Sequence, residues 1–215
     1  MSKALGTGRA SLIALVVACV VLPVLAGTTL TFTTSDPAAT ITDNTGTFTA
    51  CQNITVAGMP TQITDVTVSV SSNHSWVGDL TLRLTSPSAS VLTLINRPGR
   101  LGTGAGNDDN LVTGTPITYS DTAASGVSAE DQGDGCAGTI GVTAGCPDNY
   151  TPAPDATDTP IAGVGTNFAQ YDGADPNGVW QLCIADSAAG DTGTLTSWSI
   201  TVTSTPVELQ SFSIE

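Results

Sequence analysis

The side chains best suited to chemistry in this chain are its carboxylates. The sequence holds 19 Asp and Glu residues against five Lys and Arg, and its formal net charge is −14 at pH 7. Carboxylate oxygens are the ligands that calcium prefers. We therefore predict a calcium site in which Asp79 meets other aspartates at one end of the fold. The candidate ligands are Asp79, Asp108, Asp109, Asp186 and Asp191.

A structural role for the same aspartates is the competing interpretation. An acidic surface keeps an exported protein soluble, and Asp and Asn are common in turns. In the segment Gly78–Leu84, Gly78 permits a tight backbone approach, and Asp79 can accept hydrogen bonds from N–H groups of a neighbouring turn. Neither 107–110 nor 131–135 matches an EF-hand loop, so both interpretations stay open.

Catalytic groups are scarce. A serine hydrolase needs a base beside its nucleophile, and the only histidine is His74. No Gly-x-Ser-x-Gly motif occurs, and the nearest segment, Gly126–Glu130, fails at its last position. Nothing in the sequence indicates a carboxylate pair for glycoside hydrolysis. We therefore assign no catalytic residue, and we expect no enzymatic activity from this chain alone.

The N-terminus predicts export. Lys3 and Arg9 precede an apolar run of 14 residues, Leu12–Leu25, and the small residue Ala26 follows it. This pattern is typical of a signal peptide cleaved after Ala26, and the run is short for a membrane span. We expect a secreted protein, in the bacterial periplasm or outside the cell, with no transmembrane segment in the mature chain. Lipoprotein processing at Cys19 is the alternative.

Charge and cysteines define the mature chain further. Only Arg83, Arg97 and Arg100 remain as basic residues after cleavage, so nucleic acid and anionic membranes are excluded as partners. The four remaining cysteines suit two disulfides in an oxidising compartment. Three pairings are possible, and we favour Cys51 with Cys183 and Cys136 with Cys146. A zinc site is not expected, because no Cys-x-x-Cys spacing occurs.

Alternating apolar residues predict the strands that must position these groups. The alternation is clear in five segments, and weaker edge strands are expected within 28–49; the five are Ile63–Val70, Leu80–Leu84, Val91–Ile95, Gly178–Asp186 and Leu195–Val202. No segment shows sustained helical periodicity. The fold class is therefore all-β, a jelly-roll-like β-sandwich of about eight antiparallel strands with long acidic loops.

The tryptophans have different predicted roles. Trp180 and Trp198 alternate with small polar residues on late strands, which favours core positions over a stacking platform for sugar rings. Trp76 is the better candidate for an exposed aromatic residue.

Two motif blocks, separated by a long Gly- and Asp-rich region, carry a family resemblance. The chain resembles the P domain (P/Homo B domain) of proprotein convertases and bacterial subtilisin-like serine proteases, over residues 50 to 203. The matching positions, beside Asp79, Leu82, Leu84, Leu182, Asp186, Gly190, Asp191 and Leu195, are His74, Gly78, Leu80, Ser86, Pro87, Gly178, Trp180, Gly193 and Trp198. The resemblance implies an eight-stranded jelly roll that stabilises a subtilisin catalytic domain and modulates its dependence on calcium and pH, and it makes His74 structural.

The chain departs from the family at one hairpin. Many members have Ser-Pro-x-Gly-Thr there, whereas this chain has Ser86-Pro87-Ser88-Ala89-Ser90. A turn that needs glycine geometry would have to form without glycine at position 89.

The predicted organisation follows from these features. We divide the chain into a signal peptide (1–26), a Thr-rich segment (27–49), the P/Homo B sandwich (50–203) and a C-terminal tail (204–215). The predicted function is an accessory domain, without catalysis, for a subtilisin-like serine endopeptidase. The alternatives are a stand-alone extracellular module that binds a protein or a glycan, and a purely structural exported protein.

Overall fold

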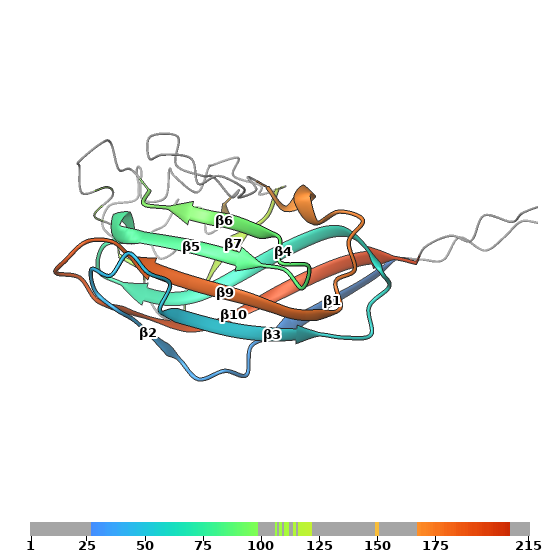
Figure 1. The fold of residues 1–215 in the computed structure, drawn as a ribbon, viewed down its shortest axis with the longest axis horizontal. Helices are drawn as coiled ribbons and strands as arrows, with labels where there is room; N and C mark the ends of the chain where they lie inside the picture. The colour runs from blue at the N-terminus through green and yellow to red at the C-terminus, as the bar shows by residue number, and fades with distance from the viewer. Residues whose placement is uncertain are drawn as a thin grey trace, which may run out of the picture.

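A computed structural model describes residues 27–98, 106, 108, 110–111, 114, 116–121, 149–150 and 167–206. These residues form two facing β-sheets with a shared core (Figure 1), so the predicted all-β sandwich is confirmed. Sheet A has the order β1-β10-β4-β7-β8, with β2 also pairing with β10, and sheet B has the order β3-β9-β5-β6. Every pair is antiparallel except β7 with β8.

The strands lie close to the segments whose alternation predicted them. The bounds are β1 Thr28–Thr33, β2 Ala39–Ile41, β3 Ala50–Val56, β4 Gln62–His74, β5 Leu80–Thr85, β6 Val91–Asn96, β7 Ile117–Tyr119, β8 Asn149–Tyr150, β9 Gly178–Asp186 and β10 Gly193–Thr205. Two short 3₁₀ helices, η1 (Val77–Asp79) and η3 (Phe168–Tyr171), are present in the described part. Because β1 and β2 pair with β10, the Thr-rich segment belongs to the sandwich.

Both predicted core tryptophans are buried between the sheets. Trp180 has no exposed surface, and its indole N–H donates a hydrogen bond to the carbonyl oxygen of Pro176 at 2.9 Å. The ring of Tyr171 meets Trp180 edge-on at 5.0 Å, and Trp198 is 1% exposed. The sequence predicted an exposed Trp76, but its side chain is half-buried. Aromatic side chains of this size contribute much of the hydrophobic stabilisation of a small sandwich.

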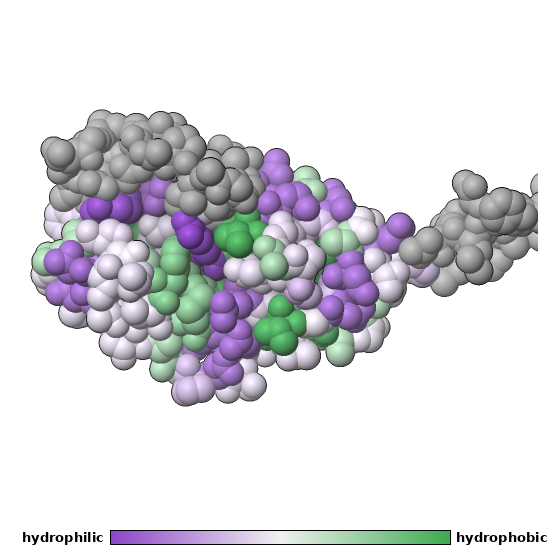
Figure 2. All heavy atoms as spheres, in the orientation of Figure 1, coloured by the Kyte–Doolittle hydropathy of each residue, from purple (hydrophilic) through white to green (hydrophobic). Residues whose placement is uncertain are grey.

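The outer surface of the described part carries few large apolar groups. Leu30 and Val179 are its exposed large hydrophobic side chains. Hydrophobic residues on the face drawn in Figure 2 are scattered among hydrophilic ones. No helix in the described ranges has the length and apolarity that a membrane span requires.

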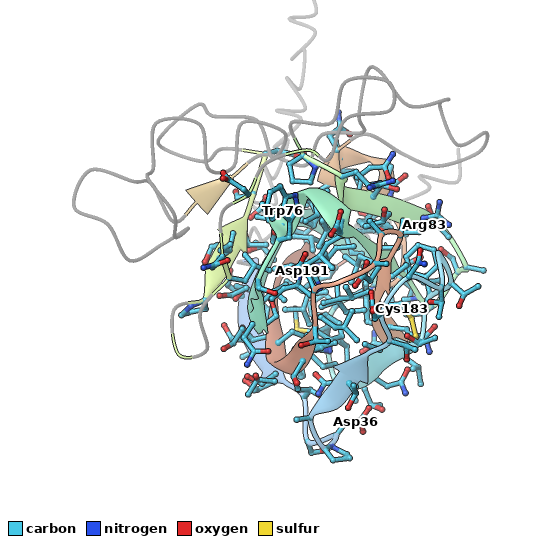
Figure 3. The ribbon with its side chains drawn as sticks, turned by 90° about the vertical axis from the view of Figure 1, so that its left-hand side faces the viewer. Asp36, Trp76, Arg83, Cys183 and Asp191 are labelled. Carbon is cyan, nitrogen blue, oxygen red and sulfur yellow. A yellow bond between two sulfur atoms is a disulfide. The ribbon has the colours of Figure 1, made fainter. Side chains whose placement is uncertain are left out.

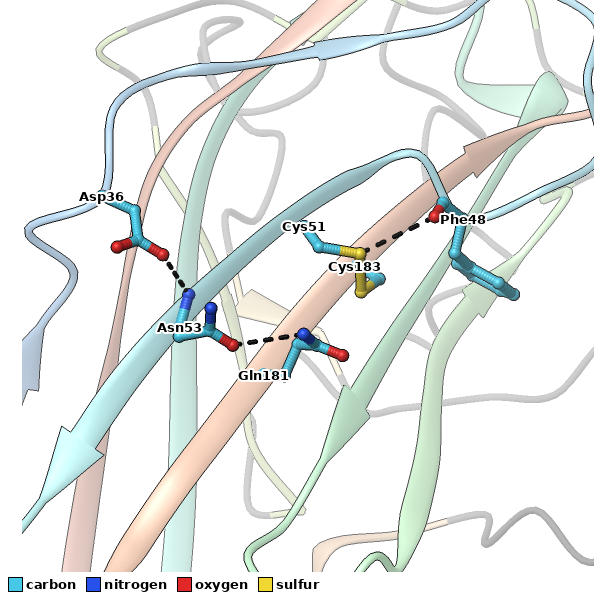
Figure 4. The surroundings of a disulfide bond; sticks show 6 residues. All are labelled: Asp36, Phe48, Cys51, Asn53, Gln181 and Cys183. Carbon is cyan, nitrogen blue, oxygen red and sulfur yellow. Dashed lines mark hydrogen bonds between the residues drawn. A yellow bond between two sulfur atoms is a disulfide. The ribbon is translucent and has the colours of Figure 1, made fainter.

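A disulfide joins Cys51 on β3 to Cys183 on β9, as predicted (Figure 4). The two residues lie directly opposite each other in the strand register. β3 is an edge strand, and side chains cover its free edge at Asn53. The Asn53 N–H donates to the carboxylate of Asp36 at 2.6 Å, and the Thr34 hydroxyl donates to the Asn53 carbonyl at 3.1 Å. These bonds satisfy backbone groups that would otherwise be open to another strand.

The β5–β6 hairpin keeps its tight turn without glycine. The Ala89 N–H donates to the Ser86 carbonyl, and the Ser86 N–H donates to the Ser90 carbonyl, both at 2.9 Å. Ala89 adopts a φ of 62°, in the left-handed region that glycine favours. The turn therefore has the geometry that the family's glycine would supply, with an alanine in its place.

Several sequence predictions fall outside the described residues. The signal peptide, Cys19, Asp109, the pair Cys136 and Cys146, and the tail beyond Pro206 belong to this group. These remain predictions.

Candidate functional site

Four buried ionisable side chains gather at one end of the sandwich, where β4 and β9 end and β5 begins. They are His74, Asp79, Arg97 and Asp186, and each is at most 8% exposed. Figure 3 views the molecule from this end, with Trp76 and Asp191 labelled on it. Because charged groups are costly to bury, each must have partners within the fold.

Asp79 is the last residue of η1 and leads directly into β5. One of its carboxylate oxygens lies 3.3 Å from Nη2 of Arg97, which donates to it. Its own carbonyl accepts the Ser187 N–H at 3.0 Å. Asp79 therefore connects the start of β5 both to β6, through Arg97, and to the turn after β9.

Arg97 follows β6 and is held by two further bonds. Its Nε donates to the Gly78 carbonyl at 3.1 Å, and its backbone N–H donates to the Leu80 carbonyl at 2.7 Å. The residue has a φ of 52°, which turns the chain and aims the guanidinium back toward η1. Sequence reasoning did not single out Arg97. A signal existed, because it is one of only three arginines after residue 9 in a strongly acidic chain.

Asp186 and His74 form the second buried pair. Nε2 of His74 lies 3.2 Å from a carboxylate oxygen of Asp186, and both side chains are fully buried. The other Asp186 oxygen accepts the Ala188 N–H at 3.0 Å. Nδ1 of His74 lies 2.8 Å from the Trp76 carbonyl and 3.2 Å from the Trp76 nitrogen. Both ring nitrogens are thus engaged inside the fold, in agreement with the structural role implied for His74.

Burial is the main influence on the charge state of Asp79. Desolvation raises the pKa of its carboxyl, and the nearby negative charges of Asp186 and Asp191 raise it further. The Arg97 guanidinium acts in the opposite direction, but the net direction is upward. Asp79 therefore holds its proton to a higher pH than an exposed aspartate.

Gly193, at the start of β10, is required by the close approach of β4. A Cβ atom at this position would overlap the Asn73 carbonyl oxygen and lie 2.7 Å from Cδ2 of His74. Gly178 is constrained in a similar way, because its φ is 132° and a Cβ atom would lie 2.8 Å from Cβ of Pro87. Two of the motif glycines named from the sequence, Gly178 and Gly193, therefore have steric reasons to be glycine.

The predicted calcium ligands are brought together only in part. Asp79 and Asp186 are close and buried, and Asp191 lies nearby, accepting the Ser75 hydroxyl at 2.6 Å. Asp108 is exposed, and Asp109 is outside the described residues. Within the described ranges, no three acidic, histidine or cysteine side chains form a group that could hold a metal ion. The converging carboxylates have protein donors as partners instead.

Comparisons with known proteins place these features in a family. A sequence model of the proprotein convertase P-domain matches residues 63–130 and 162–202, just over half of the chain. No curated protein matches.

Two solved structures are similar. A serine protease of Aeromonas sobria is 17% identical with a TM-score of 0.46, and the same bacterium's protease in complex with a chaperone is 19% identical, also with a TM-score of 0.46. In each case the match covers 86% of this chain and 28% of the other. The chain thus spans little more than a quarter of the length of these proteases.

Proposed function

Because the chain belongs to the proprotein convertase P-domain family, we propose that it is an exported, non-catalytic accessory domain for a subtilisin-like serine protease. The family match carries this proposal, since it includes both motif blocks in order. In this role the sandwich stabilises the protease or directs it to a target.

The chemistry of the described residues supports a role without catalysis. His74 has one ring nitrogen on Asp186 and the other on the backbone of Trp76. Ser75 donates its hydroxyl to Asp191, and within the described part of the chain His74 does not accept a bond from it. A nucleophile needs a positioned base that is free to take its proton. The arrangement at this end of the sandwich therefore serves to join strands.

The disulfide supports the proposed extracellular location. Disulfides persist in oxidising compartments, and the Cys51–Cys183 bond ties an edge strand to the central β9. It agrees with the export signal expected in residues 1–26.

Calcium binding is a separate prediction of the sequence, and the described contacts do not favour it. One oxygen of Asp79 is bonded to Arg97, and the two oxygens of Asp186 are bonded to His74 and to the Ala188 N–H. From these contacts we expect the same melting temperature for the mature chain in EDTA and in excess calcium. A rise with calcium that disappears in Asp191→Asn would instead establish a site at this end, because a ligand that binds only the folded state stabilises it.

A binding and melting experiment tests the accessory role. The mature chain, from residue 27 onward, is mixed with subtilisin-like proteases of the same exported protein set and isolated by affinity capture. We expect a complex with one protease and a higher melting temperature for that protease in the complex. An unrelated acidic β-sandwich protein serves as the control for charge. Absence of a complex with every protease of the set would reject the proposal.

A further inference from the structure

A pocket opens beside the buried cluster at the end of sheet A, and His74 of that cluster is one of its lining residues. It has a volume of about 760 Å³ and is lined by residues from β2, β4, β10 and the bridge at Leu111. The polar side chains of the lining include Thr40, Asn73, Ser75, Asn110 and Thr194. The pocket is a shallow depression open to solvent, which suits a ligand that lies along the surface more than one that is enclosed.

The described lining of the pocket lacks the acidic side chains that are frequent in the rest of the sequence. Its described residues include no Asp, Glu, Lys or Arg, although the formal net charge of the protein is −14. An anionic ligand would find no arginine or lysine in this lining, and the carboxylate of Asp191, beside the lining, already accepts the hydroxyl of Ser75. Hydroxyl and amide groups both donate and accept hydrogen bonds, which suits a ligand that also does both at many positions. Leu111 adds an apolar contact.

The same chemistry continues from the pocket along the sheet. Thr194 lies opposite Thr40 and Asn73 in the strand register. Further along β10, Ser199 and Thr201 lie opposite the outward-facing Ser69 and Thr67 of β4 and opposite Thr33 and Thr31 of β1. Hydroxyl groups also meet across the strands, between Thr31 and Thr201 at 2.8 Å and between Thr29 and Thr203 at 2.9 Å. We call these outward Ser and Thr residues of β1, β4 and β10 the hydroxyl strip.

The length and charge of the hydroxyl strip limit what can bind there. From Thr194 to Thr203 it covers about 30 Å, at about 3.3 Å per residue. It is neutral until Asp65, which lies opposite Thr203. The backbone of β10 is paired on both sides, whereas the outer edge of β1 is a free edge of the described sheet A. A peptide could therefore add a strand beside β1 but not along the strip itself. It also lacks the large aromatic or apolar anchors typical of protein interfaces.

We propose that the pocket and the adjoining hydroxyl strip bind a neutral oligosaccharide. Sugar hydroxyls match the amide and hydroxyl groups of Asn73, Asn110 and Thr194, and an extended chain can continue from the pocket onto the strip. The described lining has no Lys or Arg, and both ring nitrogens of His74 are engaged by Asp186 and Trp76, so no free cationic group is offered to uronic acids or sulfated sugars. This inference is independent of the protease partnership, because it uses a different surface property and a different ligand.

The test is calorimetric titration of the full mature chain with two neutral probes, cellohexaose and chitohexaose, and with an acidic probe, hexagalacturonate. We expect saturable binding of at least one neutral probe and none of the acidic one. Asn73→Ala and Thr194→Val should each weaken the binding by about tenfold, as expected for one lost hydrogen bond. Thr55→Val is the matched control, because Thr55 is exposed on β3 in the other sheet.

Three results would overturn the proposal. They are no binding of either neutral probe at millimolar concentration, equal binding of the acidic probe, and full binding by both pocket variants. Melting curves check that each variant folds. If Asn73→Ala does not fold, Thr194→Val alone decides, since valine keeps the shape and β propensity of threonine.

Discussion

At the scale of single residues, Asp79 shows how burial and a cation compete. Burial and the neighbouring carboxylates raise its pKa, while Arg97 at 3.3 Å lowers it. Removing Arg97 alone would leave a buried acid without its cation, which is among the more costly changes in a protein core. The raised pKa of Asp79 therefore means that burial and the neighbouring carboxylates outweigh Arg97 in the folded chain.

A pH series of unfolding measurements on Asp79→Asn tests that direction. Just above the ordinary aspartate pKa of 3.8, the unfolded carboxyl is ionised while the folded one still holds its proton. The folded state then binds more protons, so wild-type stability falls as the pH rises through this interval. The asparagine of the variant does not titrate. We therefore expect the difference in free energy of unfolding between wild type and Asp79→Asn to shrink as the pH rises from about 4 to about 7. A loss that grows with pH would mean that Arg97 dominates and lowers the pKa.

Gly193→Ala tests the close approach of β4 and β10. The added Cβ would overlap the Asn73 carbonyl oxygen and crowd the His74 ring, both of which are fixed by the sheet and the buried cluster. We expect a loss of at least about 2 kcal/mol in the free energy of unfolding, measured with urea.

Gly58→Ala is the control for this measurement. Gly58 has a φ of 77°, and a Cβ added there would meet no described atom within 4 Å, so the variant suffers backbone strain without a clash. Its expected cost is about 1 kcal/mol. Equal losses in the two variants would show that steric overlap at Gly193 is relieved by a small shift of the strands.

At the scale of elements, the β5–β6 hairpin contains stored strain. Ala89 holds a φ of 62° in a turn closed by two backbone hydrogen bonds. A non-glycine residue in this region costs about 1–2 kcal/mol, part of which glycine returns through its greater freedom in the unfolded chain. We expect Ala89→Gly to raise the free energy of unfolding by about 0.5 kcal/mol. Ala39→Gly, in the extended strand β2, should lower it by a similar amount. A loss in both variants would contradict strain at Ala89.

Strands could be predicted where apolar and polar residues alternate without interruption. The predicted segment 178–186 and the observed β9 have the same bounds, because its inward residues before Asp186 are apolar and turns flank it. β4 continues past the predicted end at Val70 to His74, because its last inward residues, Ser72 and His74, are polar and broke the pattern. The Asp186 carboxylate accounts for the burial of His74. Such a pair becomes visible only when residues 112 positions apart meet.

The sequence predicted that Asp79 and Asp186 belong to the candidate site, but it did not predict their contacts with Arg97 and His74. Asp79 and Asp186 were expected at one end of the sandwich, and they lie there. Calcium at this end stays a prediction, and in the structure Arg97 and His74 contact these two carboxylates. Composition led to the calcium prediction, since an excess of acids suggests an external cation. The position of Arg97 depends on the β5–β6 hairpin and on its own left-handed φ, neither of which a local pattern encodes.

At the scale of the whole molecule, one covalent bond encloses most of the sandwich. The Cys51–Cys183 disulfide joins residues 132 positions apart, so it restricts the unfolded chain strongly. It also fixes β3, whose partner strand in the described sheet B is β9 alone.

Replacing both cysteines measures this contribution. We expect the double variant Cys51→Ala/Cys183→Ala to lose about 2–5 kcal/mol of unfolding free energy, most of it through greater entropy of the unfolded chain. The matched control is Cys136→Ala/Cys146→Ala, which leaves the Cys51–Cys183 bond intact. A reductant should break the Cys51–Cys183 bond of this control, and its free energy of unfolding should then equal that of the fully reduced wild-type chain. If the Cys51→Ala/Cys183→Ala variant unfolds at the same urea concentration as the wild type, the strand pairing and the buried core hold β3 and β9 together without the bond.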